Sequence, residues 1–174
     1  SAFVQLIEAV HEIDGIDRIR FTSPHPKGYG DDLVQAYGRL PKLCESAHIP
    51  VQSGSNTMLK RMHRGYTRER FLDIIFKLRE VRPDIGITTD IIVGFPGETE
   101  EEFEATMSLC REVEFDNAFV FKYSTRRNTP AAELEKQLPK ELIEERHATL
   151  FAEVNRIGAS NYKKHIGSKM QVLV

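Results

Sequence analysis

The stretch DIIVGFPGET, at residues 90–99, decides the fold of the chain. Its first half belongs to a run of β-branched residues that predicts a strand over residues 87–93, covered on both faces because apolar and polar residues do not alternate. The Pro-Gly pair suits the centre of a type II turn, since proline presets φ and glycine permits φ > 0. Thr99 followed by Glu102 is a capping box, which predicts a helix start. The stretch is therefore a strand–loop–helix unit whose loop lies at the carboxyl end of the strand, where parallel α/β folds bind ligands.

The same alternation extends in both directions along the chain. Apolar residues at helical spacing predict helices over residues 2–12 and from Pro139 toward Ile166. Short apolar runs predict further strands at residues 18–23, 47–51 and 118–123. The strand starts lie roughly 30–40 residues apart, the length of a βα repeat, so parallel strands with right-handed crossovers are expected. Too few strands are present for an eight-stranded barrel, which leaves an α/β fold with an open or partial barrel.

Several helix starts are predicted from capping side chains. Asp31 or Asp32, Asn56 and Thr67 each precede a segment with apolar residues at helical spacing. Asn56 is expected to begin a short helix that ends at Met62, and Thr67 a longer one.

Composition limits the class of protein. The 174 residues are 40% apolar and 29% charged, as in a soluble globular chain, and a net charge of −2 gives no global attraction to nucleic acid. The cysteines are Cys44 and Cys110, too few for a disulfide framework, which favours a reducing cytoplasm. No apolar run approaches the ~20 residues of a membrane span, so no membrane partner is expected. The chain begins at Ser1, without methionine and inside a helical pattern, and is expected to be a piece of a longer protein.

Conventional catalytic motifs are missing from the sequence. It has no His-x-x-x-His pair, GxGxxG, P-loop or GxSxG. Cys44 and Cys110 are interpreted as core residues, and no metal site is expected. Each predicted strand nevertheless ends in a polar loop, and in a parallel sheet these loops lie at one rim. A ligand-binding rim without an acid–base pair suggests that a cofactor performs the chemistry.

One basic stretch departs from the balanced charge of the chain. Five cations and one acid occur within eleven residues, with His63 and Tyr66 between them: Lys60, Arg61, Arg64, Arg68 and Arg70. This pattern suits a phosphate backbone with an aromatic ring for stacking. On charge alone a solvated helix face is the preferred explanation. Arg126 and Arg127, expected on the same side as the rim loops, shift the balance toward nucleic acid.

Four segments together resemble a known family, the radical S-adenosylmethionine (SAM) methylthiotransferases. They are IPVQSGS at residues 49–55, MHRGYT at 62–67, DIIVGFPGET at 90–99 and FVFKYS at 119–124. Phe115-Asp116 and Thr129-Pro130-Ala131-Ala132 extend the resemblance over nearly the whole chain. Within the family, PVQSGS and FKYS point to the branch that methylthiolates isopentenyladenosine in tRNA. Asn128 departs from the pattern, which usually has glycine there, but asparagine tolerates a left-handed conformation.

The resemblance implies the architecture of the chain. It implies a six-stranded partial (βα)6 radical-SAM barrel, of which this chain holds strands three to six, the C-terminal half. Residues 1–138 are then the barrel portion, residues 139–166 a long connecting helix, and residues 167–174 the beginning of a small C-terminal RNA-binding β-barrel.

The resemblance also implies a transferase that adds a methylthio group to C2 of the tRNA adenosine in the cytoplasm. The residues expected to contact tRNA phosphates are Lys60, Arg61, Arg64, Arg68 and Arg126. The implied cofactors are SAM and two 4Fe-4S clusters. SAM contacts are expected from residues in the rim loops: Gln52, Ser53, Phe95 and Arg126.

The cluster ligands of the family do not occur in this sequence. The CxxxCxxC loop belongs to strand one, and three further cysteines hold the auxiliary cluster; neither set is present. The chain alone is therefore expected to be inactive, with no catalytic residue or metal ligand of its own.

Other functions stay open at this point. The sister enzyme that modifies a ribosomal-protein aspartate is similar to PLQHAS where this chain has PVQSGS. A non-catalytic nucleic-acid-binding α/β module without its cluster is another alternative. Self-association is also expected, because the edge of the predicted strand at residues 18–23 would lack a neighbour and leave Ile19 and Phe21 partly uncovered.

Overall fold

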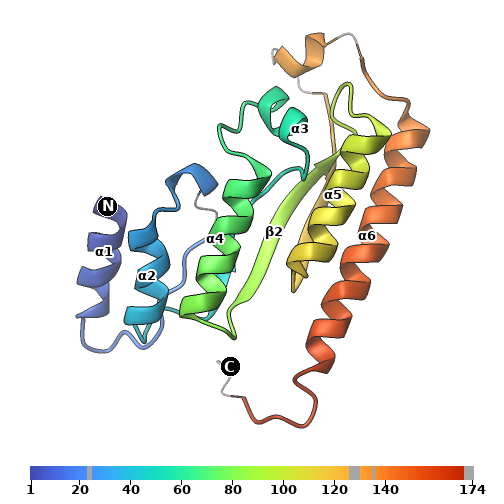
Figure 1. Ribbon diagram of the computed structural model, residues 1–174. Helices are drawn as coiled ribbons and strands as arrows, with labels where there is room; N and C mark the ends of the chain where they lie inside the picture. The colour runs from blue at the N-terminus through green and yellow to red at the C-terminus, as the bar shows by residue number, and fades with distance from the viewer. Residues whose placement is uncertain (23–24, 126–129, 135, 171–174) are drawn as a thin grey trace.

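A computed structural model describes residues 1–22, 25–125, 130–134 and 136–170 of the chain. Helices and strands alternate through most of this length (Figure 1). The elements in chain order are α1 (Ala2–His11), η1 (Pro26–Gly28), α2 (Asp31–Arg39), β1 (Ser46–His48), α3 (Asn56–Arg61), α4 (Arg68–Val81), β2 (Gly86–Val93), α5 (Glu100–Val113), β3 (Asn117–Lys122), η2 (Pro130–Glu133) and α6 (Lys140–Lys163).

The described strands form one parallel sheet in the order β1-β2-β3. The predicted α/β class with parallel strands is confirmed. Residues 18–22 do not form the expected strand: Ile19 makes a single parallel bridge to Leu43, and Phe21 packs its ring edge-on against Phe3 of α1, with centroids 5.0 Å apart. Residues 23 and 24 of that prediction lie outside the described part. The self-association expected through this edge stays a prediction.

The central strand is covered on one face only. Ile87, Thr89, Ile91 and Val93 are buried, whereas the residues between them are partly exposed. The prediction that both faces are covered was wrong, because α4, α5 and α6 lie on the same side of the sheet (Figure 1). The parallel register places Asp90 beside Phe119 and Ile92 beside Phe121 on the other, open face. Both phenylalanines are about half exposed.

Helix caps follow the sequence at some positions and depart from it at others. The capping box of Thr99 and Glu102 is present, and Thr67 caps α4 through a bond from the Arg70 amide to its hydroxyl. Ser55, not Asn56, caps α3. The Asn56 side chain instead accepts from the Arg68 amide at 2.7 Å and donates to Glu69.

The cap of α2 is also different from the prediction. Gly30 occupies the N-cap position and makes no side-chain cap bond, so neither Asp31 nor Asp32 is the cap. Both aspartates lie in the first turn instead, where their charge favours the positive end of the helix dipole.

The long helix expected over residues 139–166 is α6. Leu150, Val154 and Ile157 pack it into the core, and Gly158 lets it approach β3 closely, because a Cβ there would lie 2.7 Å from the Asp116 carbonyl oxygen. None of the described helices is both long and apolar enough to cross a membrane. The predicted strand that starts near Met170 falls mostly on residues 171–174, outside the described residues. The division into domains stays a prediction.

Candidate ligand site at the strand ends

A cleft opens at the carboxyl end of the sheet, where the loops after β1 and β2 meet β3. It comprises two adjoining cavities of about 620 and 580 Å³, which share Arg64, Ile92, Phe95 and Ala131 in their walls. Gln52, Asp90 and Tyr123 line the first, and Lys60, Arg61 and His63 line the second. The combined cleft therefore has a polar and aromatic half beside the sheet and a basic half beside α3.

The loop after β2 adopts the turn that its sequence predicts. The Glu98 amide donates to the Phe95 carbonyl at 2.9 Å, and Gly97 has φ +77° at the third turn position, as a type II turn requires. Gly94 also has positive φ. The turn presents Phe95 to both cavities, where its ring packs edge-on against Tyr123 with centroids 5.2 Å apart.

The loop after β1 holds Gln52 in a rare conformation. Its φ is +71°, which is uncommon for a residue with a side chain. Bonds to β2 hold it there: the Gln52 amide donates to the Asp90 carbonyl at 2.8 Å, and the Ile92 amide donates back at 3.0 Å. The side chain is 8% exposed and lines the cleft.

Ser53 has a different environment from Gln52. Its side chain is fully buried, its hydroxyl lies 3.3 Å from that of Thr106, and it accepts from the Ser55 amide. These bonds hold the loop against α5, and Ser53 does not line either cavity of the cleft. The structure thus brings Gln52 and Phe95 together, while Arg126 lies outside the described residues.

The basic stretch divides into two groups. Lys60, Arg61 and Arg64 line the basic half of the cleft. The Arg64 Nε is buried and has no hydrogen-bond partner among the described residues. Arg68 instead donates to the Ala105 carbonyl at 2.6 Å and pairs with Glu112 at 2.7 Å, so its guanidinium joins α4 to α5.

Sequence reasoning missed a polar cluster on the open face of the sheet. His48 Nε2 lies 3.4 Å from Asp90 Oδ2, and His48 Nδ1 lies 2.9 Å from the Thr88 hydroxyl. The His48 ring also packs edge-on against Phe119, with centroids 6.1 Å apart. The signal was available: residues two apart on a strand share a face, so Thr88 and Asp90 had to point the same way.

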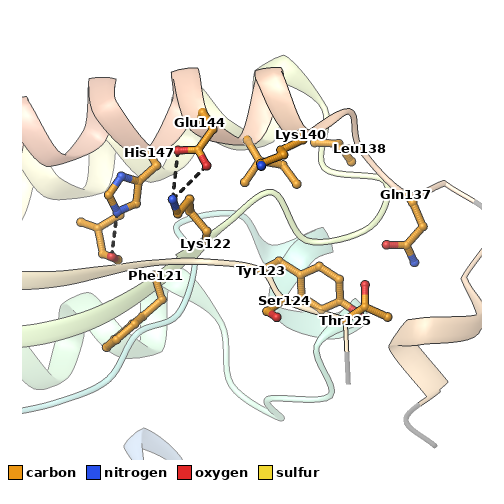
Figure 2. Close-up of a pocket in the computed structure, with 12 residues that line it drawn as sticks. Phe121, Lys122, Tyr123, Ser124, Thr125, Gln137, Leu138, Lys140, Glu144 and His147 are labelled. Carbon is orange, nitrogen blue, oxygen red and sulfur yellow. Dashed lines mark hydrogen bonds and ion pairs between the residues drawn. The ribbon is translucent and has the colours of Figure 1, made fainter. Parts of the chain in front are cut away.

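A third cavity, of about 640 Å³, lies between the end of β3 and α6. Figure 2 shows that Glu144 and His147 of α6 reach across to β3. Both Glu144 carboxylate oxygens accept from Lys122 at 2.9 Å, and His147 Nε2 lies 3.0 Å from the Val120 carbonyl oxygen. None of the α3 residues that line the basic half of the cleft lines this third cavity.

The donor set of the described residues does not suit a metal cluster. No three His, Cys, Asp or Glu side chains among them are grouped as metal ligands. Cys44 and Cys110 are free, and burial raises the pKa of the Cys110 thiol to about 12, which disfavours the thiolate that iron binds. An iron–sulfur cluster therefore finds no ligand set here.

Comparison with protein families identifies a match over most of the sheet. The model of the radical SAM superfamily matches residues 1–110. Among solved structures, a coproporphyrinogen III oxidase from Escherichia coli, described as a radical SAM enzyme, superposes with a TM-score of 0.69. The match covers 90% of this chain and 36% of that one at 17% sequence identity, a likeness of fold.

Curated relatives match at much higher identity. A tRNA-2-methylthio-N(6)-dimethylallyladenosine synthase from Akkermansia muciniphila is 54% identical over 174 residues, which is all of this chain and 38% of the relative. A protein of the same name from Opitutus terrae is 59% identical over 151 residues, 87% of this chain and 32% of that protein. The chain thus spans less than two fifths of the length of these relatives.

Proposed function

The chain belongs to the radical SAM superfamily, and from this premise we propose that it is the strand-end, SAM-binding part of a tRNA methylthiotransferase. The proposed reaction adds a methylthio group to C2 of isopentenyladenosine in tRNA. The observation that carries the proposal is the 54% identity to a tRNA-2-methylthio-N(6)-dimethylallyladenosine synthase across the whole chain. The cytoplasm, where tRNA is modified, is the proposed location.

The polar and aromatic half of the cleft is the proposed SAM site. Phe95 and Ile92 offer an apolar wall that suits an adenine ring, and Gln52 and Asp90 offer polar atoms that suit hydroxyl and ammonium groups. These residues fit SAM by their apolar and polar chemistry. When bound, SAM supplies the methyl group and the adenosyl radical that methylthiolation requires. This chain's residues bind and orient it, and the iron–sulfur ligands must come from elsewhere.

The basic half of the cleft is the proposed tRNA contact. Lys60 is exposed, and Arg64 lies in the wall that both cavities share. The positive charge of these two side chains suits a phosphate oxygen or a base edge of the RNA. The contiguity of the two halves suits an enzyme whose RNA substrate must come close to its bound SAM.

Analysis of tRNA nucleosides by mass spectrometry tests the function. The full-length protein that contains this sequence is expressed in a bacterium that lacks its own tRNA methylthiotransferase. We expect 2-methylthio-isopentenyladenosine to reappear in its tRNA. Unmodified isopentenyladenosine, together with a methylthiolated ribosomal-protein aspartate in the same cells, would favour the sister enzyme instead.

A further inference from the structure

The helix α6 contacts the turn after β2 directly. Gly94, at the end of β2, has φ +74°, and a Cβ on it would lie 2.6 Å from Cγ1 of Ile143. The backbone of the proposed SAM loop therefore lies against α6 with no room for a side chain. One helical turn later, Arg146 reaches the same loop.

A buried ion pair joins Arg146 to the loop. Arg146 Nη1 donates to the Glu98 carboxylate at 2.8 Å and to the Glu98 carbonyl at 3.0 Å. The two side chains are 5% and 1% exposed. The same carboxylate oxygen accepts from the Gly94 amide at 3.1 Å, so Glu98 links the two ends of the turn. Burial raises the pKa of Glu98 even though Gly94 and Arg146 both favour its charged form.

Further contacts hold the guanidinium in place. Arg146 Nη2 donates to Glu100 at 2.9 Å, and its Cζ lies 5.3 Å from the centre of the Phe103 ring. The neighbouring positions Glu144 and His147 hold β3, as Figure 2 shows. A single stretch of α6 therefore contacts both strand ends that flank the aromatic half of the cleft.

We propose that Arg146 is a positioning residue for the SAM loop: through Glu98 it fixes the turn at residues 94–98 and so sets where Phe95 stands in the cleft. The identity of the ligand as SAM rests on the proposed function, whereas the fixing of the turn does not. Removal of Arg146 leaves the buried Glu98 charge uncompensated, so the carboxylate must take up a proton or draw in water, and in both cases the turn loses the bonds that Arg146 donates to it. Arg146 itself does not line either cavity of the cleft.

The test compares three variants of the full-length protein with a matched control. Arg146→Met removes the pair, and Arg146→Lys keeps the charge but offers a point donor in place of the fork. Glu98→Gln with Arg146→Met removes both charges while an amide oxygen still accepts from Gly94. Arg156→Met is the control, since it breaks a pair with Glu153 on the same helix at a residue 66% exposed.

Two quantities are measured in each variant. Hydrogen exchange of a peptide spanning residues 92–100, without any ligand, reports the turn, and a peptide within α4 reports the rest of the fold. Equilibrium dialysis gives the dissociation constant of SAM. For Arg146→Met we expect exchange at least tenfold faster in the turn alone and SAM binding about tenfold weaker. The double variant should recover part of the slow exchange in the turn and part of the SAM affinity. Arg156→Met should change neither the exchange rate nor the affinity.

The outcomes separate the positioning role from a structural one and from the proposed function. Unchanged exchange at residues 92–100 in Arg146→Met overturns the proposal. Faster exchange spread equally over the turn and α4 also overturns it, because Arg146 would then stabilise the fold as a whole. If Arg146→Met does not fold, Arg146→Lys and the double variant decide on the same two quantities. A wild-type protein that binds no SAM refutes the proposed function, whereas the exchange data still judge the fixing of the turn.

Discussion

Two cations of the same basic stretch occupy different environments. Lys60 is exposed beside the cleft, whereas Arg68 is held by the Ala105 carbonyl and Glu112 between two helices. A phosphate can bind Lys60 directly, but for Arg68 it must compete with the Ala105 carbonyl and Glu112. Residue type and spacing alone could not separate them, because the carbonyl that holds Arg68 comes from a segment 37 positions away.

This difference predicts separate effects on tRNA binding. Replacing Lys60 and Arg64 by Ala in the full-length protein should weaken tRNA binding and flatten its log–log salt dependence by at most about 2. Arg68→Ala should leave that slope unchanged and lower the stability of the fold. Filter binding between 50 and about 200 mM salt measures the slope. An equal loss of slope in Arg68→Ala would contradict the assignment.

The ionised carboxylate of Glu153 is expected to make the folded chain less stable at low pH. Bonds from Arg156 and Arg111 lower its pKa to about 2. Its stabilising effect is therefore complete above the ordinary value of 4.5 and is lost as the pH falls from there to about 2. Glu153→Gln should make the unfolding free energy of the 174-residue chain less dependent on pH in that window. Glu145→Gln, at an exposed position of the same helix, should retain the wild-type dependence, as urea titrations at several pH values would show.

At the scale of elements, the sequence was informative wherever the controlling residues were local. The capping box at Thr99 and the turn after β2 depend on neighbours within four positions, and both were predicted correctly. The cap of α3 was misplaced by one residue because Asn56 bonds to Glu69 and Arg68 of the next helix. The open face of β2 was also missed, since whether helices cover a strand depends on the whole topology.

The packing of the loop after β1 against α5 gives an element-scale prediction. A Cβ on Gly54 would lie 2.4 Å from the Ala105 carbonyl oxygen and 2.7 Å from the Thr106 Cα, both backbone atoms that cannot move without shifting α5. Gly54→Ala should therefore destabilise the chain by roughly 1–3 kcal/mol. Gly28→Ala is the control, since no heavy atom lies within 4 Å of its Cβ position. Urea unfolding that gives equal stabilities for both variants would refute the close packing.

At the scale of the whole molecule, this chain supplies the proposed SAM-binding cleft but not the cysteine ligands of an iron–sulfur cluster. Two of the proposed SAM contacts, Gln52 and Phe95, come from loops after parallel strands, a location that the sequence predicted from the βα alternation. The identity of the contacts was less accessible: Ser53 is buried under the loop while its neighbour Gln52 faces the cleft, because Gln52 has positive φ. No sequence pattern predicts that Gln52 faces the cleft and Ser53 does not.

The cysteine content predicts that the 174-residue chain alone is inactive. Anaerobic treatment with iron and sulfide should produce no 4Fe-4S absorbance and no 5′-deoxyadenosine, because Cys44 and Cys110 cannot supply the three ligands of such a cluster. The full-length protein serves as the positive control. Detection of 5′-deoxyadenosine above the blank would refute this prediction.

The central claim is that the cleft at the strand ends binds SAM, and hydrogen exchange of the full-length protein with and without SAM tests it most directly. We predict slower exchange on SAM binding in peptides that cover residues 51–55, 92–98 and 121–124, which line the cleft or form its loops. A peptide over α4 should exchange at the same rate in both states. If SAM slows exchange elsewhere in the protein but not in these three segments, the result would contradict the account.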